Sequence, residues 1–205
     1  MQLARTIFAL ATAAIASSAM GAQYPYDPAP VLVLNPKHAV AGNYKLELAH
    51  SSVTAKLSHM GLSFYTIRFN TIRGDYVYDP LHPTASKIEV VIDPASIDTG
   101  NAAFNAKIAK DYFETSRFPA INFTSEGIQA AGNHGTVTGV LDMHGVKKPI
   151  ALRVVYHGSY NAEKPERMGF SATATLKRSD FGMDPNVPAE GDDMTVLIEA
   201  EFRRT

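Results

Sequence analysis

Apolar and polar residues alternate along most of this chain, in short stretches that are separated by turn-forming residues. In residues 170–177, for example, phenylalanine, alanine and leucine occupy every second position, and serine, threonine and lysine occupy the others. Successive side chains of a strand point to opposite faces, so each such stretch predicts a strand with one apolar face and one wet face. The pattern therefore favours an all-β protein.

The alternating stretches indicate about eight or nine strands. They lie near Tyr44 and Ile121 and at residues 53–59, 69–78, 87–93, 136–143, 150–157, 170–177 and 194–203. Short strands at this spacing predict a sandwich or an antiparallel barrel. An outer-membrane barrel needs an apolar outward face, whereas here one face of most strands carries charged residues or threonine. We therefore expect a soluble antiparallel barrel whose apolar face points inward.

A short helix is expected between two of these strands. Asp93-Pro94-Ala95-Ser96 is a turn signal, and apolar residues then recur at helical spacing from Asn101 until Pro119 ends the run. These apolar residues are Phe104, Ile108, Tyr112 and Phe113. Because Lys107 and Lys110 lie off this apolar stripe, we expect the helix to lie across the barrel or to close one end of it.

Small residues are frequent on the faces that should point inward. They are Ala55, Gly139, Ala172, Ala174 and Ala200. A barrel of about eight strands has an interior that side chains can just fill or that can hold one small ligand. The pattern alone leaves both alternatives open, because phenylalanine and methionine side chains from neighbouring strands could fill the space instead.

The N-terminus has the pattern of a secretory signal peptide. Residues 1–22 contain one early cation, Arg5, then an apolar run that is too short to span a bilayer, and then several small residues. Residues 23–42 are rich in proline and predict a linker, and residues 43–205 predict one barrel domain. We therefore expect export, with residues 43–205 as the functional part.

Composition narrows the possible partners and the source of stability. The 19 basic and 20 acidic side chains give a net charge of -1, which argues against nucleic acid as a partner. The chain contains no cysteine, so disulfides cannot stabilise it and its stability must come from the apolar core.

Several motifs occur in one order along the chain. They read Val90-Val91-Ile92-Asp93, Ser96-Ile97-Asp98-Thr99, Asp111-Tyr112-Phe113 and Phe118-Pro119-Ala120-Ile121-Asn122-Phe123, with His50-Ser51 upstream and Thr138-Gly139-Val140-Leu141 and Arg178-Ser179-Asp180-Phe181-Gly182 downstream. In the order and the residues of these motifs, the chain resembles the YceI-like polyisoprenoid-binding family over roughly Tyr44 to Phe202. It departs from the family at Glu47, where an aspartate is usual, and at residues 104–108, where the usual R-D-x-H-L is absent.

The resemblance implies an antiparallel lipocalin-like barrel of about eight strands with a short inserted helix. It also implies an apolar tunnel that binds an isoprenoid quinone or a polyprenyl lipid, without a cofactor, in a periplasmic carrier or storage protein. Transient contact with a membrane or a membrane protein, and a homodimer, are alternatives for its partners. The expected ligand contacts are Leu57, His59, Phe69, Val90, Ile92, Phe104, Ile108, Phe113, Phe123, Leu141, Ala172, Ala174, Arg178 and Ile198.

Catalytic and metal-binding motifs are weak, so no catalytic residue and no metal ligand is predicted. The seven histidines lack the spacing of known metal motifs. His59 is interpreted either as a core histidine or as a contact to a ligand head group. Arg178 is interpreted as a partner of Asp180 or Asp184, or as a group at the mouth of the barrel. Two alternatives to a carrier remain, namely a periplasmic enzyme that uses His59 or Arg178 on a lipid, and an interaction protein with a fully packed barrel.

Overall fold

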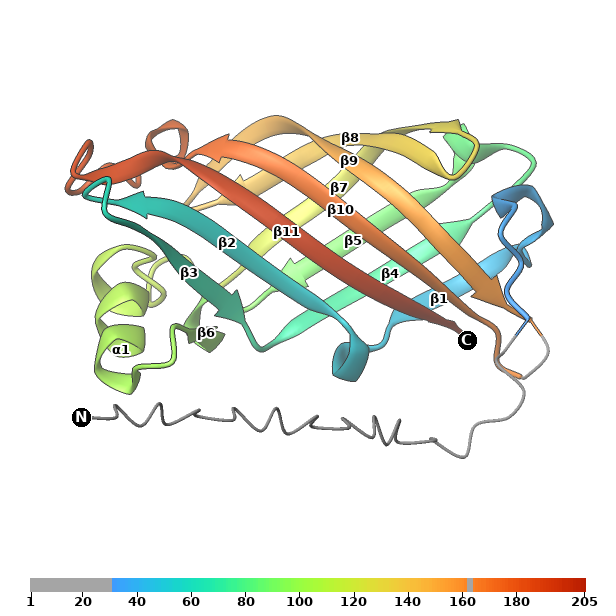
Figure 1. Ribbon diagram of the computed structural model, residues 1–205, viewed down its shortest axis with the longest axis horizontal. Helices are drawn as coiled ribbons and strands as arrows, with labels where there is room; N and C mark the ends of the chain where they lie inside the picture. Colours follow the sequence, from blue (N-terminus) through green and yellow to red (C-terminus); the bar gives the residue numbers. More distant parts are fainter. Residues whose placement is uncertain (1–30, 162–163) are drawn as a thin grey trace, which may run out of the picture.

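The strands of the computed structural model, which describes residues 31–161 and 164–205, wind around one closed barrel (Figure 1). The strands are β1 (Gly42–Leu46), β2 (Ser52–His59), β3 (Ser63–Phe69), β4 (Ile72–Tyr78), β5 (Lys87–Ile92), β6 (Ile97–Asp98), β7 (Ile121–Ala131), β8 (His134–Met143), β9 (Val146–Tyr160), β10 (Arg167–Lys177) and β11 (Glu190–Arg204). The helices are α1 (Ala102–Asp111) and the short 3-10 helices η1 (Pro36–His38), η2 (Leu48–His50), η3 (Pro83–Ala85), η4 (Pro94–Ser96) and η5 (Arg178–Phe181).

The barrel closes because β11 pairs with β1. The strand order is β1-β4-β5-β7-β8-β9-β10-β11, and every neighbouring pair is antiparallel. Leu46 of β1 lies opposite Phe202 of β11, while β2 pairs with the earlier part of β11. Strands β1 and β2 therefore share one position in the wall, as do β3 and β4, which gives a barrel of eight positions. The predicted antiparallel barrel of about eight strands with an inserted helix is confirmed.

The predicted alternation is visible in the burial of single strands. In β4, residues 72, 74, 76 and 78 are buried, and the residues between them are exposed. On the exposed face Asp75 lies opposite Lys45 of β1, and their side chains form an ion pair of 2.6 Å. Such an exposed pair contributes little to stability, so the inward apolar residues hold the wall together.

Two strands were not expected from the sequence, namely the two-residue β6 and the longer β3. Residues 63–69 form β3, whereas the alternation had indicated a single strand over 69–78. The aromatic residues Phe64 and Tyr65 are adjacent, which breaks the period of two, and Phe64 points outward and is exposed. Pairing with β2 through a tight hairpin nevertheless holds this segment in the sheet.

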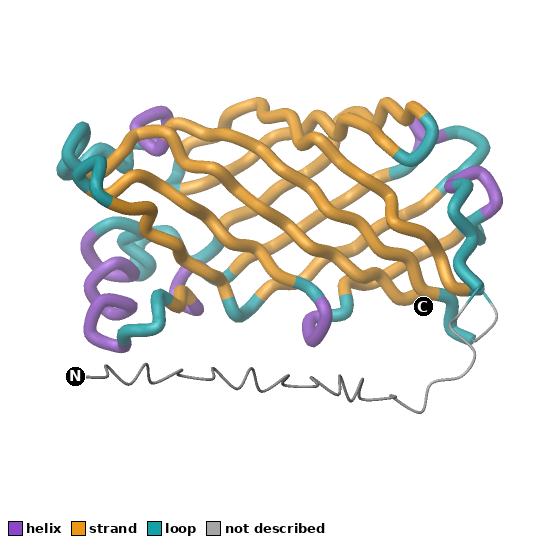
Figure 2. The backbone as a smooth tube through the Cα atoms, viewed as in Figure 1, coloured by secondary structure: helices purple, strands orange, loops and turns teal. Residues whose placement is uncertain are grey.

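Most helices and loops lie at the two ends of the barrel (Figure 2). One end carries α1, the β2–β3 hairpin and η5, and the other carries η1, the β4–β5 loop and the β7–β8 turn (Figure 1). Helix α1 begins where the Asn101 side chain accepts hydrogen bonds from the amides of Ala103 and Phe104. It packs against β6 and η4 at its end of the barrel, and none of its own residues is buried.

The described part of the predicted linker contacts the barrel. Val33 forms a bridge with Ser159 of β9, with backbone hydrogen bonds of 2.8 and 3.0 Å, and Tyr156 donates from its hydroxyl to the Val33 carbonyl. The predicted signal peptide, residues 1–22, and residues 23–30 of the predicted linker lie outside the described residues. Within residues 31–161 and 164–205 no helix combines the length and the hydropathy required to cross a membrane.

Candidate ligand-binding cavity

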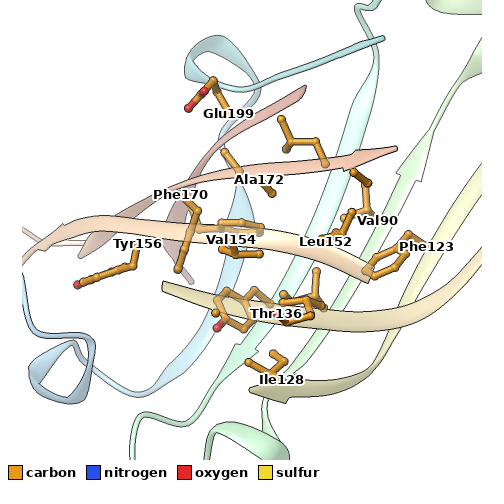
Figure 3. A pocket seen from close by; sticks show the side chains of 18 of the residues that line it. Val90, Phe123, Ile128, Thr136, Leu152, Val154, Tyr156, Phe170, Ala172 and Glu199 are labelled. Atoms are coloured by element: carbon orange, nitrogen blue, oxygen red, sulfur yellow. The ribbon is translucent and has the colours of Figure 1, made fainter. Parts of the chain in front are cut away.

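The barrel encloses a cavity of about 510 Å³ that is lined mainly by apolar side chains (Figure 3). In its middle part, Val90 of β5, Phe123 of β7, Leu152 and Val154 of β9 and Ala172 of β10 contribute to the wall. The volume lies in the range of about 300 to 1,000 Å³ that is usual for small-molecule sites. Of the two alternatives that the small inward residues left open, this cavity agrees with room for a ligand.

The room comes from a group of alanines on neighbouring strands. Ala174 of β10 lies opposite Val196 of β11, which in turn lies opposite Ala55 of β2, so the three residues form one row across the wall. All three line the cavity, as does Ala172. At Gly139, in contrast, an added Cβ would lie 2.7 Å from the Phe123 ring. The space beside Gly139 is therefore filled by an aromatic side chain, whereas the alanines line the open interior.

Buried side chains close the cavity at the α1 end. Phe113, which follows α1, is 4% exposed and packs edge-on against Phe69 with 5.6 Å between ring centroids. Met143 and Met194 line the cavity beside it, and Phe181 is buried in the same cluster. The residue that closes this end is thus Phe113 in the loop after α1, rather than a residue of the helix itself.

Aromatic side chains gather toward the opposite end of the cavity. The cluster contains Tyr44, Tyr76, Tyr78, Tyr156, Phe170 and Phe202. The Tyr44 hydroxyl donates to the Val40 carbonyl at 2.6 Å, and the Tyr78 hydroxyl donates to the Pro36 carbonyl. Burial raises the pKa of Tyr44 to about 12 and also raises the pKa values of Tyr76 and Tyr78. These hydroxyls therefore remain protonated at neutral pH, and those of Tyr44 and Tyr78 hold the segment before β1 against the barrel.

The opening of the cavity lies at this aromatic end. Residues 35–37, Leu81 and residues 132–135 line it there. Apart from tyrosines, the ionisable side chains among the described lining residues are Lys37, His134 and Glu199, and all three are exposed. The enclosed part of the cavity therefore presents hydrocarbon and aromatic surface to a ligand, with any charged contact confined to exposed positions.

Nine of the residues predicted as ligand contacts lie in the cavity wall. They are Phe69, Val90, Ile92, Phe113, Phe123, Leu141, Ala172, Ala174 and Ile198. They come from seven different segments, and the closure of the barrel brings them together. Their contact with a ligand stays a prediction.

Four further predicted residues do not line the cavity. Leu57 pairs with Met194, and His59 lies beyond it at the exposed end of β2. Phe104 is half exposed on α1, where its ring contacts Tyr65, and Ile108 is partly buried against the core cluster. These four residues are therefore not part of the cavity wall, and His59 is not a core histidine; its contact with a ligand head group stays a prediction.

Arg178 has a structural position that neither interpretation anticipated. It is 5% exposed, and its guanidinium donates hydrogen bonds to four backbone carbonyls. These belong to Met183, Pro185, Glu190 and Gly191, at 2.7, 2.9, 2.9 and 2.9 Å. Within the described segments no ion pair joins Arg178 to Asp180 or Asp184. The arginine therefore shapes the loop before β11 and does not lie at the mouth.

The aromatic cluster was missed as part of the site. Alternation places Phe170 on the apolar face of its strand, Tyr76 lies at an inward position of β4, and Tyr156 of β9 also lines the cavity. The signal that could have found them is the gathering of large aromatic residues near one end of several strands. These aromatic residues are far apart in the sequence, so their clustering can be recognised only once the strand order is known.

Outside the cavity, one group could hold a metal ion. One ligand atom each from Glu47, His50 and Glu201 lie within 4.8 Å of one another. The Glu47 carboxylate accepts hydrogen bonds from the amides of Ala49 and His50, and Glu201 accepts one from Arg167 at 2.9 Å. These contacts fix η2 between β1 and β2 and give the carboxylates a structural role.

A comparison with protein families matches the YceI-like domain over residues 44–202. The chain belongs to the YceI-like family. A UPF0312 protein of Shewanella baltica is 37% identical to it over 176 residues, which cover 82% of this chain and 91% of that protein.

Solved structures share the YceI-like barrel. The crystal structure of Burkholderia cenocepacia BcnA is 25% identical, with a TM-score of 0.68, and the match covers 76% of this chain and 98% of BcnA. A polyisoprenoid binding domain from Saccharophagus degradans, implicated in plant cell wall breakdown, matches with a TM-score of 0.63 and 16% identity, over 81% of this chain and 100% of that domain. At 16% identity this last match supports the fold alone.

Proposed function

We propose that this protein is a periplasmic carrier or storage protein that holds one long apolar isoprenoid lipid, such as a polyprenyl lipid or an isoprenoid quinone, in its barrel. The observation that carries the proposal is the enclosed, apolar cavity of about 510 Å³. Burial of hydrocarbon contributes about 0.8 kcal/mol per CH2 group, so an apolar chain gains affinity without polar contacts.

The comparisons support a lipid ligand for this cavity. The family model covers almost the whole barrel, and the Saccharophagus degradans domain with the same fold is named as polyisoprenoid binding. The pattern of residues 1–22 supports export, which is the basis for proposing the periplasm as the compartment.

The two ends of the cavity suggest one orientation of the ligand. The end beside Phe113 is closed by apolar side chains, so a hydrocarbon tail fits there. The open end has tyrosines in its wall and Lys37 at its edge, so a polar head group fits there. His59 and Arg178, the residues on which a lipid enzyme would depend, do not line the cavity. We therefore favour binding without chemistry.

We expect the affinity to rise with the length of the isoprenoid chain. Delipidated protein would be loaded with a fluorescent polyene fatty acid, which is then displaced by isoprenoid alcohols of increasing length. Each added isoprene unit should strengthen binding by about tenfold or more until the cavity is full. This figure already subtracts the free energy that is lost when the ligand chain is ordered in the cavity.

The same titration includes His59→Gln as a control variant, which should bind with unchanged affinity because His59 lies outside the cavity. An affinity that is independent of chain length would contradict the proposal. So would conversion of the isoprenoid to a product in a reaction that is lost in His59→Gln.

A further inference from the structure

The edge of the cavity opening carries large apolar side chains that are exposed. Leu34, which precedes η1, is 66% exposed, and Leu81, in the β4–β5 loop, is 76% exposed and also lines the cavity. We call these two leucines, together with Lys37, His38, His82 and His134, the mouth rim. Exposed apolar residues at the opening of a site are typical of surfaces that bind another molecule.

The exposed polar residues of the mouth rim are one lysine and three histidines. Within residues 34–38, 79–83 and 129–135, the basic and histidine residues are Lys37, His38, His82 and His134, and the single carboxylate is Asp79. That carboxylate accepts hydrogen bonds of 2.9 Å from the amides of Leu81 and His82, which hold the loop in its turn. Asp79 is therefore engaged by its own loop, whereas Lys37 is an exposed cation at the edge of the cavity.

Exposed leucines flanked by basic residues have the composition of segments that insert into the boundary of an anionic membrane. The position of the mouth rim adds a second argument. A long hydrocarbon chain leaves a bilayer at a high cost in free energy if it must cross water. An opening that lies against the bilayer removes that step.

A second apolar surface on the molecule lies at the wrong end for this role. Met60, Leu62 and Phe64 of the β2–β3 hairpin are exposed, and the Phe104 ring of α1 contacts Tyr65 of the same hairpin. They lie at the end that Phe113 closes, so a membrane there would not face the cavity opening. The hairpin is therefore a matched control surface.

We propose that the mouth rim docks this protein on an anionic lipid bilayer, so that the ligand passes between the bilayer and the cavity without crossing water. The inference rests on the proposed function, because it assumes that the cavity accepts a membrane lipid. It adds the surface, the charge and the orientation of the contact.

The test measures sedimentation of the protein with vesicles of phosphatidylcholine and phosphatidylglycerol, and with vesicles of phosphatidylcholine alone. The wild type should bind the anionic vesicles more tightly, and salt should weaken this binding. The double variant Leu34→Ser/Leu81→Ser should lose about tenfold or more in affinity, because two leucines no longer enter the interface. Lys37→Glu should also weaken binding to the anionic vesicles, whereas Leu62→Ser/Phe64→Ser should bind like the wild type.

The proposal is overturned if the wild type does not bind anionic vesicles, if the mouth-rim variant binds like the wild type, or if the hairpin variant loses as much affinity. Organic extraction of the same preparations separates this proposal from the proposed function. Lipid present in a protein that does not bind vesicles rejects the docking surface alone. Vesicle binding through the mouth rim by a protein that never contains lipid rejects the carrier function alone.

Discussion

Replacement of Ala174 by phenylalanine is expected to remove most of the bound lipid while the barrel still folds. Ala174 lines the cavity in the same row as Val196 and Ala55, so the new ring would occupy space that the ligand needs. A large side chain that enters a void costs less than one that enters a packed core, where the usual cost is about 1 to 3 kcal/mol. We expect lipid occupancy to fall by about tenfold or more, with a change in unfolding free energy below about 1.5 kcal/mol.

The measurement combines extracted lipid per protein with denaturant unfolding followed by circular dichroism. Ala151→Phe is the matched control, because Ala151 is exposed on β9, and it should retain its lipid. Full occupancy in Ala174→Phe would show that the ligand does not reach this row. Loss of folding in that variant would show that the row is packed rather than open.

The second large effect is expected on stability, at Arg178. Arg178→Met keeps a long side chain but leaves four backbone carbonyls without their donor. Removal of a buried charged donor that serves several carbonyls lowers the free energy of unfolding by about 3 kcal/mol or more. Arg178→Lys should recover only part of this loss, because an ammonium group cannot reproduce the planar arrangement of the guanidinium donors.

Arg73→Met is the control for this prediction, since Arg73 is exposed on β4 and its loss should change stability by less than about 0.5 kcal/mol. Loss of the Arg178 hydrogen bonds should also disturb the closed end of the cavity. The loop that it holds contacts Tyr112 through Asn186, whose side-chain amide donates to the Tyr112 hydroxyl at 2.8 Å. Equal unfolding free energies for Arg178→Met and the wild type would contradict this account.

The barrel could be predicted because its signal is local. A period of two identifies the inward face of each strand, and the turn residues between strands imply antiparallel neighbours. The inward alanines at 55, 172 and 174 were visible in the same way, and they do line the cavity. Gly139 could not be separated from them, because the Phe123 ring that fills its space comes from another strand.

The parts of the site that could not be predicted depend on contacts between distant segments. The apolar stripe of α1 predicts a buried face, but only the fold shows that Phe113 closes the cavity while Phe104 stays half exposed. Likewise, Arg178 lies in a motif that could serve a head group, and its role follows only from the path of the loop before β11. The position of the opening depends on the strand order.

The central claim is that the cavity holds one long apolar molecule, and organic extraction of the purified protein followed by mass spectrometry tests it most directly. Extraction should be made from protein purified without detergent, with Ala174→Phe prepared in parallel. The account predicts one isoprenoid lipid per protein chain in the wild type and little or none in Ala174→Phe. A wild-type protein that yields no lipid, and that takes up none from isoprenoid-containing vesicles, would contradict it.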